Sequence, residues 1–150
     1  MVDSKQKGTR AEILIRNRLI ELSGLGWERT PGSGALDPKH MLKGDLYIPG
    51  QKNNYVVEVK HYAEDHLTSS ILTNKSPQLF IWWEQALRQG NQVNQIPLLI
   101  FKFDRSKIFV AFSDFPSSNY NYILLNINKY EVYVALLDEW YRVEQPKFLT

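Results

Sequence analysis

Two short segments that alternate apolar and polar residues, joined by a turn, constrain the fold of this chain most. Residues 45–48 (DLYI) and 55–60 (YVVEVK) have this pattern, and residues 49–54 between them (PGQKNN) have the composition of a turn. We therefore predict a β-hairpin. A turn centred on the middle of the connecting stretch places Asp45 directly opposite Glu58.

The predicted hairpin has one polar face and one apolar face. Lys60 follows Glu58 by two residues, so its side chain shares a face with those of Glu58 and Asp45. The opposite face carries apolar residues suited to a core: Leu46, Ile48, Val57 and Val59. This register requires that neither strand contains a β-bulge, because one extra residue would shift the pairing.

The remaining patterns predict an α/β fold with a central mixed β-sheet flanked by helices. A helix is expected over residues 9–23, before Gly24 and Gly26. Its apolar stripe would consist of Leu14, Ile15, Leu19 and Leu22. The other expected segments are a helix at 77–89, strands at 27–30, 98–103 and 107–112, a loop at 31–43, irregular structure at 114–129, and either strand or helix at 130–142.

The length of 150 residues predicts a single domain, 1–150, that is large enough to bury its own core. The chain has no cysteine, which excludes disulfides, thiolate metal sites and a cysteine nucleophile. No segment approaches the roughly 18 apolar residues of a membrane span, and the N-terminus lacks a signal-peptide core. We therefore expect a soluble, cytoplasmic protein without a membrane partner.

The net charge of +2 is too small to indicate nucleic-acid binding by itself, but the basic residues are unevenly placed. The N-terminal segment contains Lys5, Lys7, Arg10, Arg16 and Arg18, and three more lie in or beside the predicted loop, namely Arg29, Lys39 and Lys43. Such a cluster can neutralise phosphates and give salt-dependent, largely sequence-independent binding. The alternative is an ordinary solvated helix face.

The polar face of the hairpin brings together groups that repel one another unless a partner is present. Two carboxylates at cross-strand distance are unfavourable, and a divalent cation removes the conflict. Mg²⁺ prefers hard oxygen ligands, so Asp45, Glu58 and a backbone carbonyl make a suitable partial site. Water on such a cation can attack a phosphodiester, while Lys60 orients the nucleophile or stabilises the oxyanion. The alternative is an exposed strand face with a weak Glu58–Lys60 pair.

The ordered motifs resemble those of the PD-(D/E)XK nucleases, and more closely those of the archaeal-type Holliday junction resolvases. The motifs, all within residues 7–90, are Lys7-Gly8-x3-Glu12, Arg29-x3-Ser33-Gly34, Gly44-Asp45, Glu58-x-Lys60 and Glu84-Gln85. Gly44 stands where the family name has proline, a position whose side chain takes no part in the chemistry. Residues 114–150 show no such resemblance and are left unassigned.

The resemblance implies a restriction-endonuclease-like core and a Mg²⁺-dependent endonuclease that resolves four-way DNA junctions by paired symmetric nicks. Asp45, Glu58 and the Val59 carbonyl would bind the metal, for which Mn²⁺ is expected to substitute. Lys60 would be the catalytic lysine, and Glu12 would approach the metal directly or through water. The implied DNA-binding residues are Lys5, Lys7, Arg10, Arg29, Ser33 and Gln85.

Arg29 and Ser33 would contact phosphates of the cleaved strand, and Gln85 would support the site from the second helix. A homodimer is expected, because two symmetric nicks call for two related active sites. A small recombination nuclease of this kind would suit a phage or an archaeon.

Several of these residues also have a simpler structural interpretation. Thr9-Arg10-Ala11-Glu12 fits a capping box, so Glu12 could instead cap its helix. Arg29 could form an ion pair with Glu28 or Glu21 rather than bind phosphate. Ser33 could serve only to form a turn, and Gln85 could occupy a plain position on a helix surface.

Histidines and tryptophans near the motifs are weaker candidates. His61 and His66 are more typical of phosphate or solvent neighbours than of a catalytic base. Trp82 and Trp83 are adjacent, so only one of them can easily face a core. For both, packing in the core or at a dimer interface is favoured over stacking on a base.

Two different functions are also compatible with these motifs. A nuclease of the same fold can act on duplex, flap or single-stranded DNA, and a protein of this fold can bind DNA without cutting it. The presence together of Asp45, Glu58 and Lys60 favours catalysis, because a decayed site need not keep all three.

Overall fold

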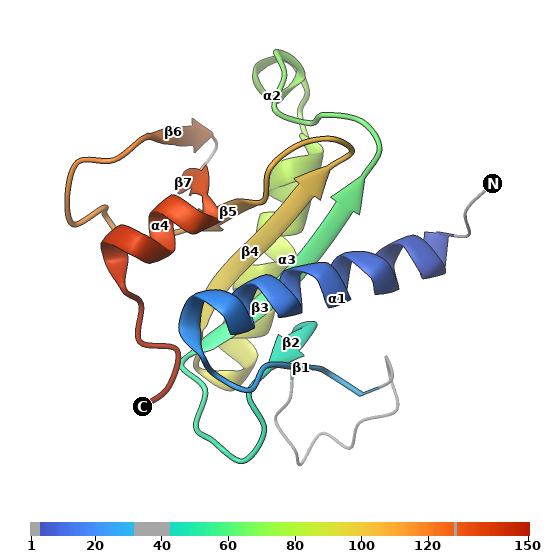
Figure 1. Cartoon of the computed structure of the whole chain (residues 1–150). Helices are drawn as coiled ribbons and strands as arrows, with labels where there is room; N and C mark the ends of the chain where they lie inside the picture. The colour runs from blue at the N-terminus through green and yellow to red at the C-terminus, as the bar shows by residue number, and fades with distance from the viewer. Residues whose placement is uncertain (1–3, 32–42, 128) are drawn as a thin grey trace.

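We describe the protein from a computed structural model, in which residues 4–31, 43–127 and 129–150 are described. They form a seven-stranded mixed sheet with the strand order β1-β2-β3-β4-β5-β7-β6 (Figure 1). The strands are β1 (Glu28–Arg29), β2 (Leu46–Tyr47), β3 (Tyr55–Tyr62), β4 (Ile96–Phe103), β5 (Phe109–Phe112), β6 (Tyr122–Ile127) and β7 (Tyr130–Leu136). The helices are α1 (Ser4–Ser23), α2 (Ser70–Thr73), α3 (Gln78–Val93) and α4 (Leu137–Glu144). The predicted α/β class, a mixed sheet flanked by helices, is confirmed.

Helices cover both faces of the sheet, with α1 and α4 on one face and α3 on the other (Figure 1). On the first face, Ile15 and Leu19 of α1 are fully buried with Val57 of β3. On the second face, Trp83 of α3 is buried with Phe101 of β4. The two cores explain the apolar character of both faces of β3 and β4, since a strand covered on both sides reads as a nearly continuous apolar run.

Helix α1 begins at Ser4, so the predicted start at residue 9 is wrong. Its buried stripe includes Ala11, Ile15 and Leu19, whereas Leu14 is exposed because it lies off the sheet-facing side. The predicted end is confirmed: Gly24 has a φ of +72° and donates its N–H to the Ile20 carbonyl at 2.8 Å.

The hairpin register predicted from the sequence is confirmed by the pairing of Leu46 with Val57. Strand β2 is shorter than predicted, whereas β3 runs two residues further, to Tyr62. The longer strand is stabilised by its second neighbour, because β4 pairs with β3 in parallel over the whole of its length.

The C-terminal third contains more regular structure than the sequence predicted. Residues 114–129 were expected to be irregular, yet β6 lies there and pairs antiparallel with β7. Its residues YILLNI lack an apolar–polar alternation, which hid the strand. The ambiguous segment 130–142 is a strand followed at once by a helix, β7 and α4. None of the described helices is long and apolar enough to cross a membrane.

Candidate active site

Gly44 sets the position of Asp45 at the start of β2. Gly44 has a φ of +85°, and a Cβ atom there would lie 2.7 Å from the Val57 carbonyl oxygen. Proline is excluded by its fixed negative φ, and any other side chain would clash with the backbone of β3. The departure from the proline of the family name is therefore a requirement of the local backbone.

Asp45 lies against β3 through both its backbone and its side chain. Its N–H donates to the Val57 carbonyl at 2.7 Å, and its Oδ2 accepts a hydrogen bond of 2.7 Å from the Val59 N–H. The Val59 carbonyl points to the same edge of β3 as the Val59 N–H, because both groups of one strand residue face one neighbour. The Asp45 side chain and the Val59 carbonyl therefore lie on the same side of β3, the side that faces β2.

Glu58 is the one buried charged residue among the described residues, with 2% of its surface exposed. The alternative of an exposed strand face is therefore wrong for this position. Gln85 of α3 donates a long hydrogen bond of 3.4 Å from Nε2 to Oε2 of Glu58, and Gln89 lies one helical turn further along the same helix face. The second helix thus lies directly over the carboxylate.

The surroundings of Glu58 disfavour its charge. Burial, and then the charge of Asp45 and a hydrogen bond with it, raise the pKa of Glu58 from an ordinary 4.5 to about 8. The Lys60 ammonium and the Gln89 amide act in the opposite direction. Asp45 and Lys60 are therefore both close enough to act on the charge of Glu58, as the hairpin register predicted.

Glu12 and Arg29 form an ion pair beside these residues. Arg29 of β1 donates from Nε to Oε1 of Glu12 at 3.1 Å and reaches the Thr9 hydroxyl at 3.4 Å. Burial, followed by the charge of Asp45, raises the pKa of Glu12, and Arg29 partly offsets this. Since Glu12 lies well inside α1, the capping-box alternative is wrong, and the acid partner of Arg29 is neither Glu28 nor Glu21.

The chemistry of these groups fits a hard divalent cation. Asp45 and Glu58 supply carboxylate oxygens and Val59 a carbonyl oxygen, the ligand types that Mg²⁺ prefers. Burial, and then repulsion by Asp45, raises the pKa of Glu12 and of Glu58, and a bound cation would relieve the repulsion. Within the described parts of the chain, no three His, Cys, Asp or Glu side chains form a metal cluster, so carbonyl and water ligands would complete the shell.

The predicted DNA-binding residues are placed unevenly. Arg10 is exposed on α1. Lys5 and Lys7 belong to the same helix, for which the structure describes only the backbone at these two positions. Ser33 also falls outside the described residues, and so does Lys39 of the predicted loop. Gln85 contacts Glu58 and so lies over the acids rather than on an open surface.

The histidines and tryptophans near the motifs contact other side chains of the protein. His61 lies 2.9 Å from Asp104 through its Nε2, and His66 packs in an aromatic cluster with Trp82. Both Trp82 and Trp83 are buried, so the preference for core packing is confirmed for both. They fit because α3 packs over the sheet with a wide apolar face.

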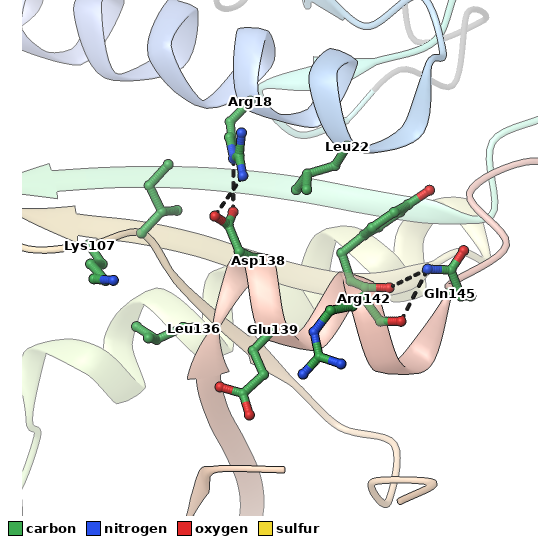
Figure 2. A pocket seen from close by; sticks show the side chains of 10 residues that line it. Arg18, Leu22, Lys107, Leu136, Asp138, Glu139, Arg142 and Gln145 are labelled. Atoms are coloured by element: carbon green, nitrogen blue, oxygen red, sulfur yellow. Dashed lines mark hydrogen bonds and ion pairs between the residues drawn. The ribbon is translucent and has the colours of Figure 1, made fainter.

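A groove of about 870 Å³ lies away from these acids, between α1 and α4 (Figure 2). Arg18 crosses it and forms two hydrogen bonds with the Asp138 carboxylate, of 2.8 and 2.7 Å, and one of 2.9 Å with Glu21. Arg18 is thus engaged with two acids, unlike Arg16, which bonds to the Asn17 side chain. Among the described arginines of α1, Arg18 therefore joins two helices.

Sequence reasoning missed Gln89. Its Oε1 is buried without a hydrogen-bond partner among the described residues, while its amide lowers the pKa of Glu58, against the larger effect of burial. The spacing of four residues from Gln85 was the available signal, because residues i and i+4 share one face of a helix.

Known proteins resemble this chain along nearly its whole length. The family model described as "Phage putative PDDEXK endonuclease" matches residues 3–150. Protein D14 of Escherichia phage T5 is 40% identical over 147 residues, which cover 93% of this chain and 92% of that protein. A Holliday junction resolvase of Archaeoglobus fulgidus is a structural match with a TM-score of 0.45 and 15% identity, covering 89% of this chain and 87% of that one.

Proposed function

Because the chain belongs to the phage PD-(D/E)XK endonuclease family, we propose that it is a metal-dependent DNA endonuclease centred on Asp45, Glu58 and Lys60. The observation that carries the proposal is the buried Glu58 carboxylate, which lies beside the Asp45 carboxylate and the Lys60 ammonium. A protein rarely buries an acid next to another acid without a function, because both desolvation and repulsion oppose it.

Asp45, Glu58 and the Val59 carbonyl would hold the cation, which we propose is Mg²⁺, with Mn²⁺ able to substitute. When bound, such a cation supplies an activated water and offsets negative charge on the phosphate oxygens. The Val59 N–H fixes the rotamer of Asp45, and Gln85 donates a hydrogen bond to the carboxylate of Glu58. The ligands would thus be oriented before the cation arrives.

Lys60 would act on the reacting phosphate from the same strand face. Its ammonium lies near the Glu58 carboxylate, where it can orient the attacking water by a hydrogen bond and stabilise the negative charge of the transition state. Glu12 is a further acid of this region: it pairs with Arg29, and the charge of Asp45 contributes to its raised pKa after burial. We propose that it approaches the cation through water.

We propose the four-way DNA junction as the substrate, supported by the ordered motifs of residues 7–90. The basic residues of α1 would neutralise the phosphates of the junction arms, with Lys5, Lys7, Arg10, Arg29 and Ser33 as contacts. Gln85 would contribute indirectly, through Glu58.

A homodimer would place two such sites on one junction, and strand β6 supports a second copy as the partner. This strand is an edge of the sheet, and its Ile123 and Leu124 side chains, on opposite faces, are 49% and 47% exposed. Natural edge strands are usually protected by charge, proline or a bulge, whereas residues 122–127 contain no charged residue and no proline. Two copies of β6 can pair antiparallel about a two-fold axis.

The test is incubation of the purified protein with a synthetic four-way junction and MgCl₂. We expect paired nicks at symmetric positions in opposite strands. An excess of unlabelled linear duplex should not suppress this cleavage. Preferred cleavage of duplex, flap or single-stranded DNA would instead assign the substrate to that class. Junction binding without cleavage in either Mg²⁺ or Mn²⁺ would contradict the nuclease and leave a DNA-binding protein.

A further inference from the structure

Strand β3 leads from the buried acid of the candidate site to the protein surface. Its alternation places Glu58, Lys60 and Tyr62 on one face. Exposure along this face increases from 2% at Glu58, through a half-buried Lys60, to 43% at Tyr62, the last residue of the strand. Tyr62 is therefore the point at which this row of side chains meets solvent.

The Tyr62 ring is held by its neighbours although much of it is exposed. Trp82 lies against it with ring centroids 4.9 Å apart and an angle of 32° between the planes. The His66 ring contacts it edge-on at 5.4 Å. Trp82 is itself buried. It lies on α3 three residues before Gln85, the residue that contacts Glu58. One face of α3 thus supports both the acid and the exposed aromatic ring.

We propose that Tyr62 is a stacking platform for a nucleobase of the bound DNA strand, an inference that rests on the proposed nuclease function. Two strand residues span roughly 6.6 Å, and successive nucleotides of one B-DNA strand rise by about 3.4 Å. The ring therefore lies within about two nucleotide steps of Lys60. A rigid, half-exposed aromatic ring suits a base, because any base offers a π-face for stacking and the ring loses little conformational freedom on binding.

The charges around Tyr62 favour a base over a phosphate at this point. Glu64 and Asp65 follow it in the chain and are exposed, so they repel the sugar–phosphate backbone. A base in continuous duplex is already stacked on its neighbours, and its release costs a few kcal/mol. The platform would consequently select DNA that presents an unpaired or unstacked base beside the cleaved phosphate, as at a branch point.

The first test is photo-crosslinking of the wild-type protein, without divalent cation, to junctions with 5-iodouracil at single positions around the branch. We expect a crosslink at Tyr62 from positions within about two nucleotides of the branch and none from the centre of an arm. Binding of the junction with crosslinks only at other residues would overturn the stacking role and leave the nuclease proposal intact. Failure of the wild type to bind any DNA would overturn both proposals.

The second test compares junction affinity in Tyr62→Phe and Tyr62→Leu. Stacking is worth roughly 1–3 kcal/mol per base, so Tyr62→Leu should weaken junction binding by about 5- to 150-fold and leave linear duplex binding unchanged. Tyr62→Phe keeps the ring and should bind like the wild type. Phe115→Leu is the matched control, because Phe115 is an aromatic residue that is 78% exposed and packs against Tyr133 instead.

Tyr62 also packs against Trp82, so its replacement can destabilise the fold. The unfolding temperature of each variant shows whether weaker junction binding reflects loss of the stacking ring or loss of folded protein. Equal junction affinity in the folded Tyr62→Leu variant and the wild type would overturn the inference. If Tyr62→Leu does not fold, the crosslink map of the wild type decides by itself.

Discussion

The Asp45 carboxylate accepts a hydrogen bond of 2.7 Å from the N–H of Val59 and so continues the β2–β3 ladder through a side chain. One carboxylate oxygen is used by the backbone, and the other would be a ligand of the proposed cation. The position of a proposed metal ligand is thereby tied to the register of the hairpin. A slip of one residue would move Asp45 to the opposite face of the sheet, which α1 covers.

This hydrogen bond predicts a difference between two substitutions of Asp45. Both Asp45→Asn and Asp45→Ala remove the charge that repels Glu58, but only asparagine keeps an acceptor for the Val59 N–H. We expect Asp45→Ala to be less stable than Asp45→Asn by about 1 kcal/mol, the usual net value of one hydrogen bond. Chemical unfolding in EDTA measures the difference, and equal stability of the two variants would show that the bond contributes nothing.

The buried Glu58 predicts a specific pH dependence of stability. Its pKa is about 8 in the folded protein and near 4.5 when unfolded, so between these values the folded state retains a proton that the unfolded state has lost. Stability of the metal-free protein should therefore fall as pH rises through this window. Glu58→Gln removes the effect, so its gain in unfolding temperature over the wild type should be small at pH 4.5 and largest near pH 8.

Thermal unfolding of both proteins across this pH range, in the presence of EDTA, tests the assignment. A difference in unfolding temperature that does not vary with pH would mean that Glu58 is ionised in the folded state.

Two arginines of α1 should behave differently toward DNA. Arg10 is exposed, and its neutralisation in Arg10→Gln should reduce the slope of log affinity against log salt by about one. Arg18 is the matched control on the same helix, because it is engaged with Asp138 and Glu21. Titrations of the junction at several salt concentrations compare the two variants. A larger decrease in this slope for Arg18→Gln than for Arg10→Gln would place the DNA at the opposite end of α1.

A dimer through β6 predicts that a charge on this edge gives monomers. Leu124→Lys introduces the kind of residue that natural edge strands use to prevent pairing. Sedimentation analysis should show a dimer for the wild type and a monomer for this variant. Leu72→Lys, at an exposed leucine of α2, should remain dimeric. A monomeric wild type, or a dimeric Leu124→Lys, would exclude this interface.

Local pattern predicted the hairpin well, because its register depends only on alternation and on the length of the turn. The pairing of Leu46 with Val57 follows from residues near in sequence. The same reasoning failed where partners are distant in sequence. Arg29 is paired with Glu12 because the sheet brings β1 beside α1, and no short-range pattern in the sequence contains that contact.

Two further misses have identifiable physical causes. Strand β6 was missed because exposed apolar residues lie on both its faces, so it lacks the alternation of a half-buried strand. The contribution of Gln89 was missed because a glutamine on a helix is ordinarily a surface residue. The packing of α3 over β3 brings it near the buried Glu58 carboxylate, where its amide favours the charged form. The roles of Asp45, Glu58, Lys60 and Glu12 in catalysis stay predictions.

The most direct test of the proposed site is single-turnover cleavage of a four-way junction in MgCl₂ by the wild type and by Asp45→Asn. Binding of the junction is measured in parallel without metal. We expect paired nicks from the wild type, and at least about a hundredfold slower cleavage by the variant, since the cation contributes several kcal/mol to the transition state. Junction affinity should be unchanged. Cleavage by Asp45→Asn at the wild-type rate would contradict the account.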